Sequence, residues 1–174
     1  IFENNWVVIG TASSIPEVGD IKSFNLLGIP LILIRDNNYK VRVFHNVCSH
    51  RGYKLINEDC NLRKVIKCPY HSWSYNFNGK LVATPHIGGV NVHDHKDFNK
   101  DKSNLKEVRS TIWLDLIFVN ISKDATSFDE YIKPLEKRWS PFISKEDYHL
   151  IYQPKDFGYF KFEAKCNWKF AIEN

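Results

Sequence analysis

A chain of 174 residues with 43% hydrophobic and 14% aromatic residues has room for one folded domain, or for one domain and part of a second. Its net charge of +4 is spread along the chain without a basic block, which argues against a nucleic-acid partner. The longest apolar runs, such as residues 29–34, are far too short to span a bilayer, so no membrane partner is expected either.

The first half of the chain is predicted to form short strands. Alternating or β-branched apolar residues mark them, and turn-forming residues separate them. Gly28-Ile29-Pro30 interrupts two of these strands, Asp36-Asn37-Asn38 is a hairpin turn signal, and Asn78-Gly79 is another. The expected strands are residues 6–10, 21–26, 31–35, 40–44, 64–67, 73–77 and 80–82.

The second half is more varied. A polar, irregular segment over residues 85–103 precedes a hairpin of residues 105–110 and 112–120, in which 112–119 is the strongest strand pattern of the chain. Ser127 is predicted to cap a helix over 129–139, which Pro141 ends. Strands at 148–153 and 159–165 and a helix capped by Asn167 are expected to open a second domain. The fold class is therefore all-β, built from antiparallel sheets.

Two short motifs carry most of the chemistry. Cys48-Ser49-His50 and Cys68-Pro69-Tyr70-His71 each offer one thiolate and one imidazole. A Rieske [2Fe–2S] cluster needs this mixture, because two Cys bind one iron and two His bind the other. A structural zinc site is the alternative, but zinc fingers usually keep like ligands together.

The residues around these motifs resemble the Rieske domain of ring-hydroxylating and related Rieske non-haem iron oxygenases. The similar segments are residues 48–52 (CSHRG), 68–75 (CPYHSWSY) and 78–81 (NGKL), and the resemblance covers about the first 120 residues. Ser72 replaces the Gly of the usual C-P-Y-H-G-W sequence, which raises the question of whether this position needs a positive φ. The disulfide cysteines of respiratory Rieske proteins are replaced by Tyr53 and Tyr70.

The resemblance implies a domain organisation. Residues 1–140 would form the Rieske domain, with a cluster-binding subdomain at about 46–81. Residues 141–174 would be a linker and the truncated start of a catalytic domain, which would form a short α/β piece. Within this segment, residues 167–169 and 173–174 resemble the opening of the oxygenase catalytic domain. Since the sequence has no Met and stops in an expected helix, we interpret it as a fragment.

The resemblance also implies a function. Cys48, His50, Cys68 and His71 would hold the [2Fe–2S] cluster and pass electrons to a mononuclear Fe(II) present only in the full-length oxygenase. Its D-x-x-H-x-x-x-x-H pattern is absent here, so the fragment itself is not expected to be catalytic. An NAD(P)H-dependent reductase or a ferredoxin would donate the electrons, and the full-length protein would be a cytoplasmic homotrimer or α3β3 assembly. The alternative is a stand-alone Rieske ferredoxin, which leaves about fifty residues after the β domain without a role.

Other candidate residues have simpler interpretations. Cys60 and Cys166 are expected to be ordinary thiols that are at least partly buried, and His93-Asp94-His95 a solvated loop rather than a metal site. His45 is expected on a strand surface. Tyr70 and Trp73 are candidates for shielding the cluster from water, or for ordinary core packing. Arg51 is expected either to pair with a carboxylate or to be exposed.

Overall fold

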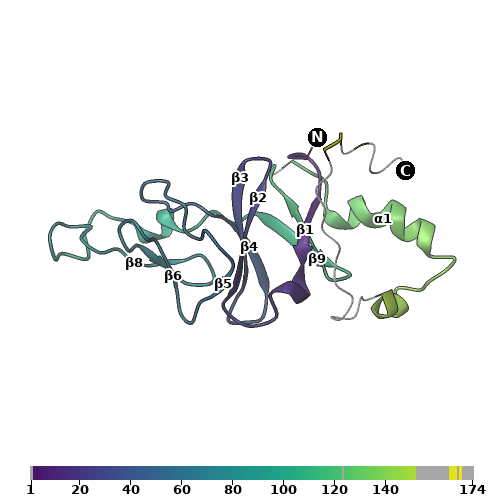
Figure 1. Cartoon of the computed structure of the whole chain (residues 1–174), viewed down its shortest axis with the longest axis horizontal. Helices are drawn as coiled ribbons and strands as arrows, with labels where there is room; N and C mark the ends of the chain where they lie inside the picture. Colours follow the sequence, from purple (N-terminus) through teal and green to yellow (C-terminus); the bar gives the residue numbers. More distant parts are fainter. Residues whose placement is uncertain (1, 123, 152–164, 168, 170–174) are drawn as a thin grey trace.

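The chain is described by a computed structural model, which covers residues 2–122, 124–151, 165–167 and 169. It is elongated, with strands β6 and β8 near one end and helix α1 near the other (Figure 1). The strands are β1 (Val7–Thr11), β2 (Asp20–Leu26), β3 (Ile29–Arg35), β4 (Val41–His45), β5 (Cys60–Asn61), β6 (Ile66–Lys67), β7 (Ser74–Tyr75), β8 (Leu81–Ala83), β9 (Arg109–Trp113) and β10 (Leu116–Asn120). The helices are η1 (Ala12–Ser14), η2 (Lys100–Ser103), α1 (Phe128–Trp139) and η3 (Glu146–Ile151).

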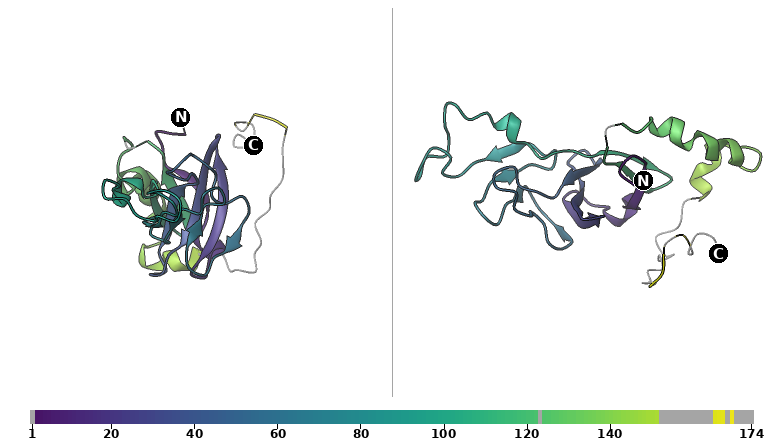
Figure 2. Two further views of the ribbon diagram at one scale, coloured as in Figure 1. Left: turned by 90° about the vertical axis from the view of Figure 1, so that its left-hand side faces the viewer. Right: turned by 90° about the horizontal axis from the view of Figure 1, so that it is seen from above.

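The strands form three sheets, with orders β1-β10-β9, β4-β3-β2-β5 and β6-β7-β8, and every strand pair is antiparallel. The extended segment before β9 joins the first two sheets, because the Val108 amide donates to the carbonyl oxygen of Val43 and the His45 amide donates to that of Lys106. The views in Figure 2 show the third sheet projecting from this body. The expected all-β fold of antiparallel sheets is confirmed.

Strand β3 is buried on both faces, which explains its continuous run of apolar residues. Leu31 and Leu33 pack into one hydrophobic cluster with residues of β1, β4 and β10. Ile32 and Ile34 point to the other face, where they pack against a projecting subdomain that contains the third sheet and the two Cys/His motifs. Alternate side chains of a strand face opposite sides of the sheet, so a continuous run of apolar residues is typical of a strand that is buried on both faces. Strand β3 is thus the layer on which the projecting subdomain rests.

Two turns of the structure differ from those that the sequence indicated. The interruption expected at 28–30 is a two-residue turn at Leu27-Gly28, both with positive φ, so β3 already begins at Ile29. The expected single strand over 112–119 is wrong, because Leu114 and Asp115 turn the chain with φ of 50° and 67°. The Asp115 carboxylate accepts from the amide and hydroxyl of Ser13, at 2.9 and 2.5 Å. This distant contact fixes a turn that local apolar propensity does not favour.

Helix α1 confirms the helix expected at 129–139, and the Ser127 hydroxyl accepts from the Glu130 amide as its cap. The strand expected at 148–153 is wrong over its described part, which is the 3-10 helix η3. The Asp147 amide donates to the Ser144 carbonyl and thereby closes a local turn. The strand expected at 159–165 lies outside the described residues apart from Lys165, and the helix expected from Trp168 lies outside them apart from Lys169, which is helical. The Lys169 amide donates to the Asn167 side chain at 3.1 Å, as expected of a cap. No helix of the described residues is long and apolar enough to cross a bilayer.

Candidate metal centre

Two loops of the subdomain have the same backbone pattern. In the first, the Cys48 amide donates to the Tyr53 carbonyl and the Gly52 amide to the Cys48 carbonyl, at 2.8 and 2.9 Å. In the second, the Cys68 amide donates to the Trp73 carbonyl and the Ser72 amide to the Cys68 carbonyl, at 2.8 and 3.0 Å. Gly52 and Ser72 therefore occupy equivalent positions, and both have positive φ, of 68° and 60°. The second loop does require a left-handed residue where Ser replaces Gly.

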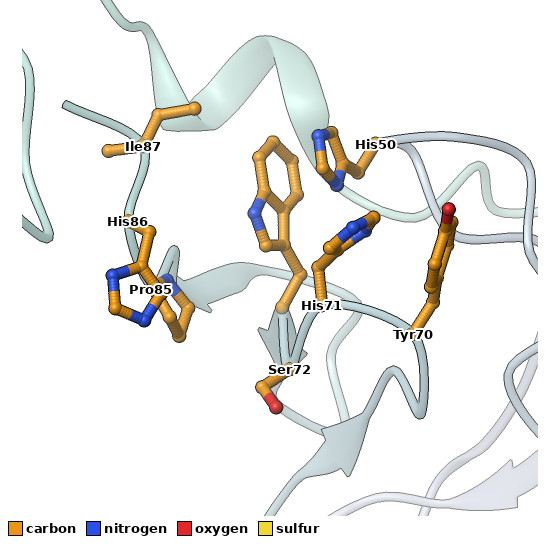
Figure 3. A pocket seen from close by; sticks show the side chains of 8 residues that line it. His50, Tyr70, His71, Ser72, Pro85, His86 and Ile87 are labelled. Atoms are coloured by element: carbon orange, nitrogen blue, oxygen red, sulfur yellow. The ribbon is translucent and has the colours of Figure 1, made fainter. Parts of the chain in front are cut away.

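The matched loops bring the four candidate ligands together in two layers. The side chains of Cys48 and Cys68 are buried, and both thiols are free. The imidazoles of His50 and His71 lie further out, with ring centroids 4.8 Å apart. Both rings line a cavity of about 480 Å³, together with Tyr70, Trp73 and the segment 85–87 (Figure 3). A pair of buried thiols thus lies behind a pair of imidazoles that face a cavity.

Aromatic rings hold the outer layer in place. The buried indole of Trp73 stacks on His50, with centroids 4.5 Å apart and an interplanar angle of 9°. Tyr70 packs against His71 at 3.7 Å but is 53% exposed, so Trp73 shields this site from water more than Tyr70 does. The rings of Tyr53 and Tyr70 face each other at 5.5 Å. The two positions that carry a disulfide in respiratory Rieske proteins therefore meet here as well, through ring packing.

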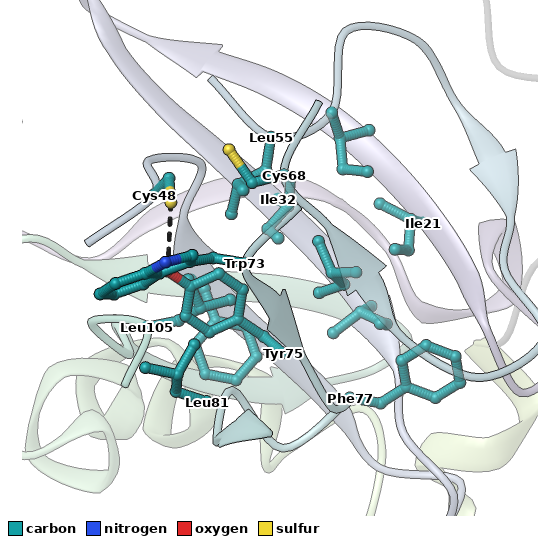
Figure 4. Packing of buried hydrophobic residues seen from close by; sticks show 14 residues of the cluster. Ile21, Ile32, Cys48, Leu55, Cys68, Trp73, Tyr75, Phe77, Leu81 and Leu105 are labelled. Atoms are coloured by element: carbon teal, nitrogen blue, oxygen red, sulfur yellow. Dashed lines mark hydrogen bonds between the residues drawn. The ribbon is translucent and has the colours of Figure 1, made fainter. Parts of the chain in front are cut away.

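A hydrogen-bond network links the Cys48 thiol to Tyr75 and Ser49. The hydroxyl of Tyr75 lies 3.2 Å from the Cys48 sulfur (Figure 4). The same hydroxyl accepts from the Ser49 amide at 3.1 Å and lies 2.7 Å from the Ser49 hydroxyl, which donates to the Ser103 carbonyl. Sequence reasoning missed Tyr75 and Ser103. The signal for Tyr75 was present, because Trp73, Tyr75 and Phe77 alternate along the strand expected at 73–77, and all three side chains are buried.

Burial shifts the pKa of two of these groups, in a direction that favours metal binding at His50 and opposes it at Cys48. Desolvation raises the pKa of the Cys48 thiol, although the Tyr75 hydroxyl opposes the shift. Desolvation lowers the pKa of His50, and the charges of His71 and Arg51 add to the effect. A neutral imidazole can bind a metal directly, whereas the thiol must first lose its proton. A cation bound between the sulfurs would supply the positive charge that this buried position lacks.

The donor set fits a two-iron group better than a single ion. Among the described residues, no three His, Cys, Asp or Glu side chains converge on a point that one metal could occupy. A tetrahedral zinc site needs four such ligands around one ion, whereas a Rieske cluster divides them between two irons. The Nδ1 atom of His71 is buried and has no hydrogen-bond partner. Since buried polar atoms are normally paired, this nitrogen is suited to a ligand between the loops.

The other candidate residues lie apart from this centre. Cys60 and Cys166 are free thiols, as expected, but the expected partial burial is wrong, because both are exposed. His45 is half-buried on β4, and burial followed by the charge of Lys106 lowers its pKa. His93 faces His86 across the irregular segment at 5.2 Å, and its Nδ1 accepts from the His86 amide. Arg51 is exposed and makes no ion pair with the described residues.

Known proteins with similar sequences are oxygenase subunits. The chain is 29% identical over 170 residues to the α subunit of 2-aminobenzenesulfonate 2,3-dioxygenase from Alcaligenes sp, which covers 97% of this chain and 41% of that protein. It is 26% identical over 174 residues to the oxygenase subunit of carnitine monooxygenase from Escherichia coli (strain K12), covering 100% of this chain and 44% of the relative. The chain thus spans less than half the length of these relatives.

Solved structures agree. Naphthalene 1,2-dioxygenase with indole bound in its active site superimposes with a TM-score of 0.70 at 28% identity, covering 83% of this chain and 32% of that one. A quaternary ammonium Rieske monooxygenase in complex with L-carnitine also gives a TM-score of 0.70, at 25% identity, covering 81% of this chain and 39% of that one. The family model described as "Rieske [2Fe-2S] domain" matches residues 5–94, more than half of the chain and both ligand loops. The chain therefore belongs to the Rieske [2Fe-2S] domain family, whose cofactor is a [2Fe–2S] cluster.

Proposed function

We propose that Cys48, Cys68, His50 and His71 are the cluster ligands, with the two Cys on one iron and the two His on the other. The support is the pair of matched loops, the two buried thiols, and the unpaired Nδ1 of His71. When bound, the cluster supplies one-electron transfer, and its His-ligated iron raises the reduction potential relative to an all-Cys cluster. The single observation that carries the assignment is the convergence of a Cys-x-His loop and a Cys-x-x-His loop that share one backbone pattern.

The protein's own residues determine where the electron leaves. Trp73 stacks on one imidazole and excludes water from it, whereas the cavity of about 480 Å³ keeps the outer face of both rings accessible. His50 and His71 are therefore the groups that a redox partner would reach. We infer that electron uptake is coupled to protonation of these imidazoles, because added negative charge raises their basicity. A midpoint potential that stays constant from neutral to strongly alkaline pH would contradict this coupling.

The acceptor that fits best is a mononuclear non-haem iron in the remainder of an O₂-dependent oxygenase. The support is the similarity to oxygenase subunits along almost the whole chain, including the part beyond the Rieske match. In this proposal residues 1–140 form the Rieske domain, and 141–174 begin the catalytic domain that carries Fe(II). The full-length protein would form a homotrimer or an α3β3 assembly and receive electrons from an NAD(P)H-dependent reductase or a ferredoxin. Free thiols at all four Cys suit a reducing cytoplasm.

Metal content and spectroscopy test the ligand assignment. The purified holoprotein should show the visible absorption of a [2Fe–2S] cluster and, when reduced, its electron paramagnetic resonance signal. Cys68→Ser should abolish both, because serine cannot replace the thiolate. Cys60→Ser is the matched control and should leave both unchanged, since Cys60 is exposed on β5. A colourless protein that holds one zinc per chain would refute the assignment.

A second measurement separates an oxygenase from a stand-alone Rieske ferredoxin. The full-length protein should contain one iron per chain beyond the two of the cluster, and it should consume O₂ when supplied with reductant and substrate. A full-length protein with two irons per chain and no O₂ consumption would identify an electron carrier instead.

A further inference from the structure

A second cavity reaches the centre from the thiol side. Its volume is about 520 Å³, and it shares no lining residue with the cavity over the imidazoles. It reaches Cys48 and Ser49 of the first ligand loop, and its outer wall carries two lysines, Lys102 and Lys106. The full lining is His45, Val47, Cys48, Ser49, Lys102, Asn104 and Lys106.

The charge of this second cavity is uncompensated. Lys102 and Lys106 are exposed, and neither makes an ion pair with the described residues. No Asp or Glu lines the cavity. Lys100, one turn earlier, is different, because Asp94 lies 3.7 Å from its ammonium group. Two unpaired ammonium groups beside a cysteine ligand make a local positive potential that favours an anionic partner.

The lysines are held in place by the backbone that bears them. The Ser103 carbonyl accepts from the Ser49 hydroxyl, and the Asn104 side chain accepts from the Leu81 amide at 2.9 Å. The Lys106 carbonyl accepts from the His45 amide at 2.9 Å. The segment 102–106 is therefore tied to the first ligand loop, to β8 and to β4. A partner bound to this segment would be positioned against the Cys48 side of the centre.

We propose that this thiol-side cavity is the docking site of an acidic electron-donor protein, whose carboxylates pair with Lys102 and Lys106. The proposal rests on the proposed function, since it assumes the cluster. One electron leaves the reduced donor and enters the centre beside Cys48, and the proton that the imidazoles take up with it comes from solvent. The imidazole side then stays open to the acceptor, so the donor and the acceptor need not compete for one surface. Charge complementarity of this kind acts mainly on the association rate.

Charge reversal tests the proposal in the intact holoprotein. The probe is an acidic plant-type [2Fe–2S] ferredoxin, whose potential of about −400 mV lies below that of a Rieske centre. K102E/K106E should slow reduction by this ferredoxin at low salt by about tenfold or more and weaken binding of the oxidised ferredoxin, measured by fluorescence anisotropy, to a similar extent. The control K64E/K80E makes the same change in net charge at exposed positions of the cluster-binding subdomain, and it should stay within about twofold of the unmodified protein.

Two further measurements make the outcome specific. Reduction by the methyl viologen radical, a cation, should not be slowed in K102E/K106E, which shows that the cluster is intact. K102Q/K106Q, which removes charge without reversing it, should give an intermediate rate and covers the case in which the double Glu variant does not fold. Equal slowing by K64E/K80E, or normal ferredoxin reduction and binding in K102E/K106E, would overturn the docking site. A protein that viologen cannot reduce, with no cluster signal, would overturn the proposed function itself.

Discussion

Removing the Tyr75 hydroxyl should lower the midpoint potential of the cluster. In Tyr75→Phe the ring and its packing remain, but the oxygen 3.2 Å from the Cys48 sulfur is lost. A hydrogen bond to a ligand sulfur withdraws electron density from the iron and so favours the reduced state. Its loss therefore favours the oxidised state.

The magnitude follows from the strength of such a bond. A hydrogen bond to a charged group contributes roughly 1.5–3 kcal/mol, and only the difference between the two redox states changes the potential. If about half is differential, the shift is about 1 kcal/mol, or about 40 mV for one electron. Redox titration followed by visible absorption measures it, and a potential that is unchanged or higher in Tyr75→Phe would refute the reasoning.

The neighbouring serine should shift the potential in the opposite direction. The Ser49 hydroxyl donates to the Ser103 carbonyl, so the single proton of Tyr75 is shared between the Ser49 oxygen at 2.7 Å and the Cys48 sulfur. In Ser49→Ala the competing acceptor is gone, and the phenol proton is left to the sulfur. The midpoint potential should rise, by less than Tyr75→Phe lowers it. A decrease in Ser49→Ala would show that Ser49 does not compete with Cys48 for the phenol proton.

Three substitutions test the architecture by chemical denaturation. Ser72→Gly should stabilise the protein by about 0.5–1 kcal/mol with the cluster absorption retained, because glycine adopts φ of 60° without a Cβ penalty, and a lower denaturation midpoint would contradict this. Asp115→Ala should cost about 1–2 kcal/mol, since both contacts with Ser13 disappear, whereas no loss would mean that the β9–β10 turn forms without them. Asp36→Asn should cost about 2 kcal/mol at neutral pH, because it weakens the bond from Arg42 at 2.7 Å. Burial opposes ionisation of Asp36, but the hydrogen bonds from Arg42 and two backbone amides outweigh burial and lower the pKa of Asp36. The stability that Asp36 contributes is therefore present above the ordinary carboxyl pKa and is lost as pH falls through the lowered pKa. Asp36→Asn should lack this part of the acid dependence, and an unchanged curve of stability against pH would contradict the assignment.

The sequence by itself indicated the four candidate ligands and most of the strands. Cys48, His50, Cys68 and His71 stand in two short motifs, and local backbone geometry positions the residues within each motif. The helix at 128–139 was also predictable, because its cap at Ser127 is a local signal. The Asn78-Gly79 turn was also predictable from the sequence. Only the structure shows a second reason for glycine there, because a Cβ at Gly79 would lie 2.5 Å from the Phe44 ring.

The tertiary structure alone decided the features that depend on distant contacts. The turn at 114–115 interrupts an apolar run because Asp115 contacts Ser13, which lies more than a hundred residues away in the chain. The hydroxyl of Tyr75 meets the Cys48 sulfur only after the two ligand loops have been placed face to face. Lys102 and Lys106 likewise became part of a site when their segment was tied to the first loop. Local propensity reports what a segment favours in isolation, whereas these features arise from groups that only folding brings together.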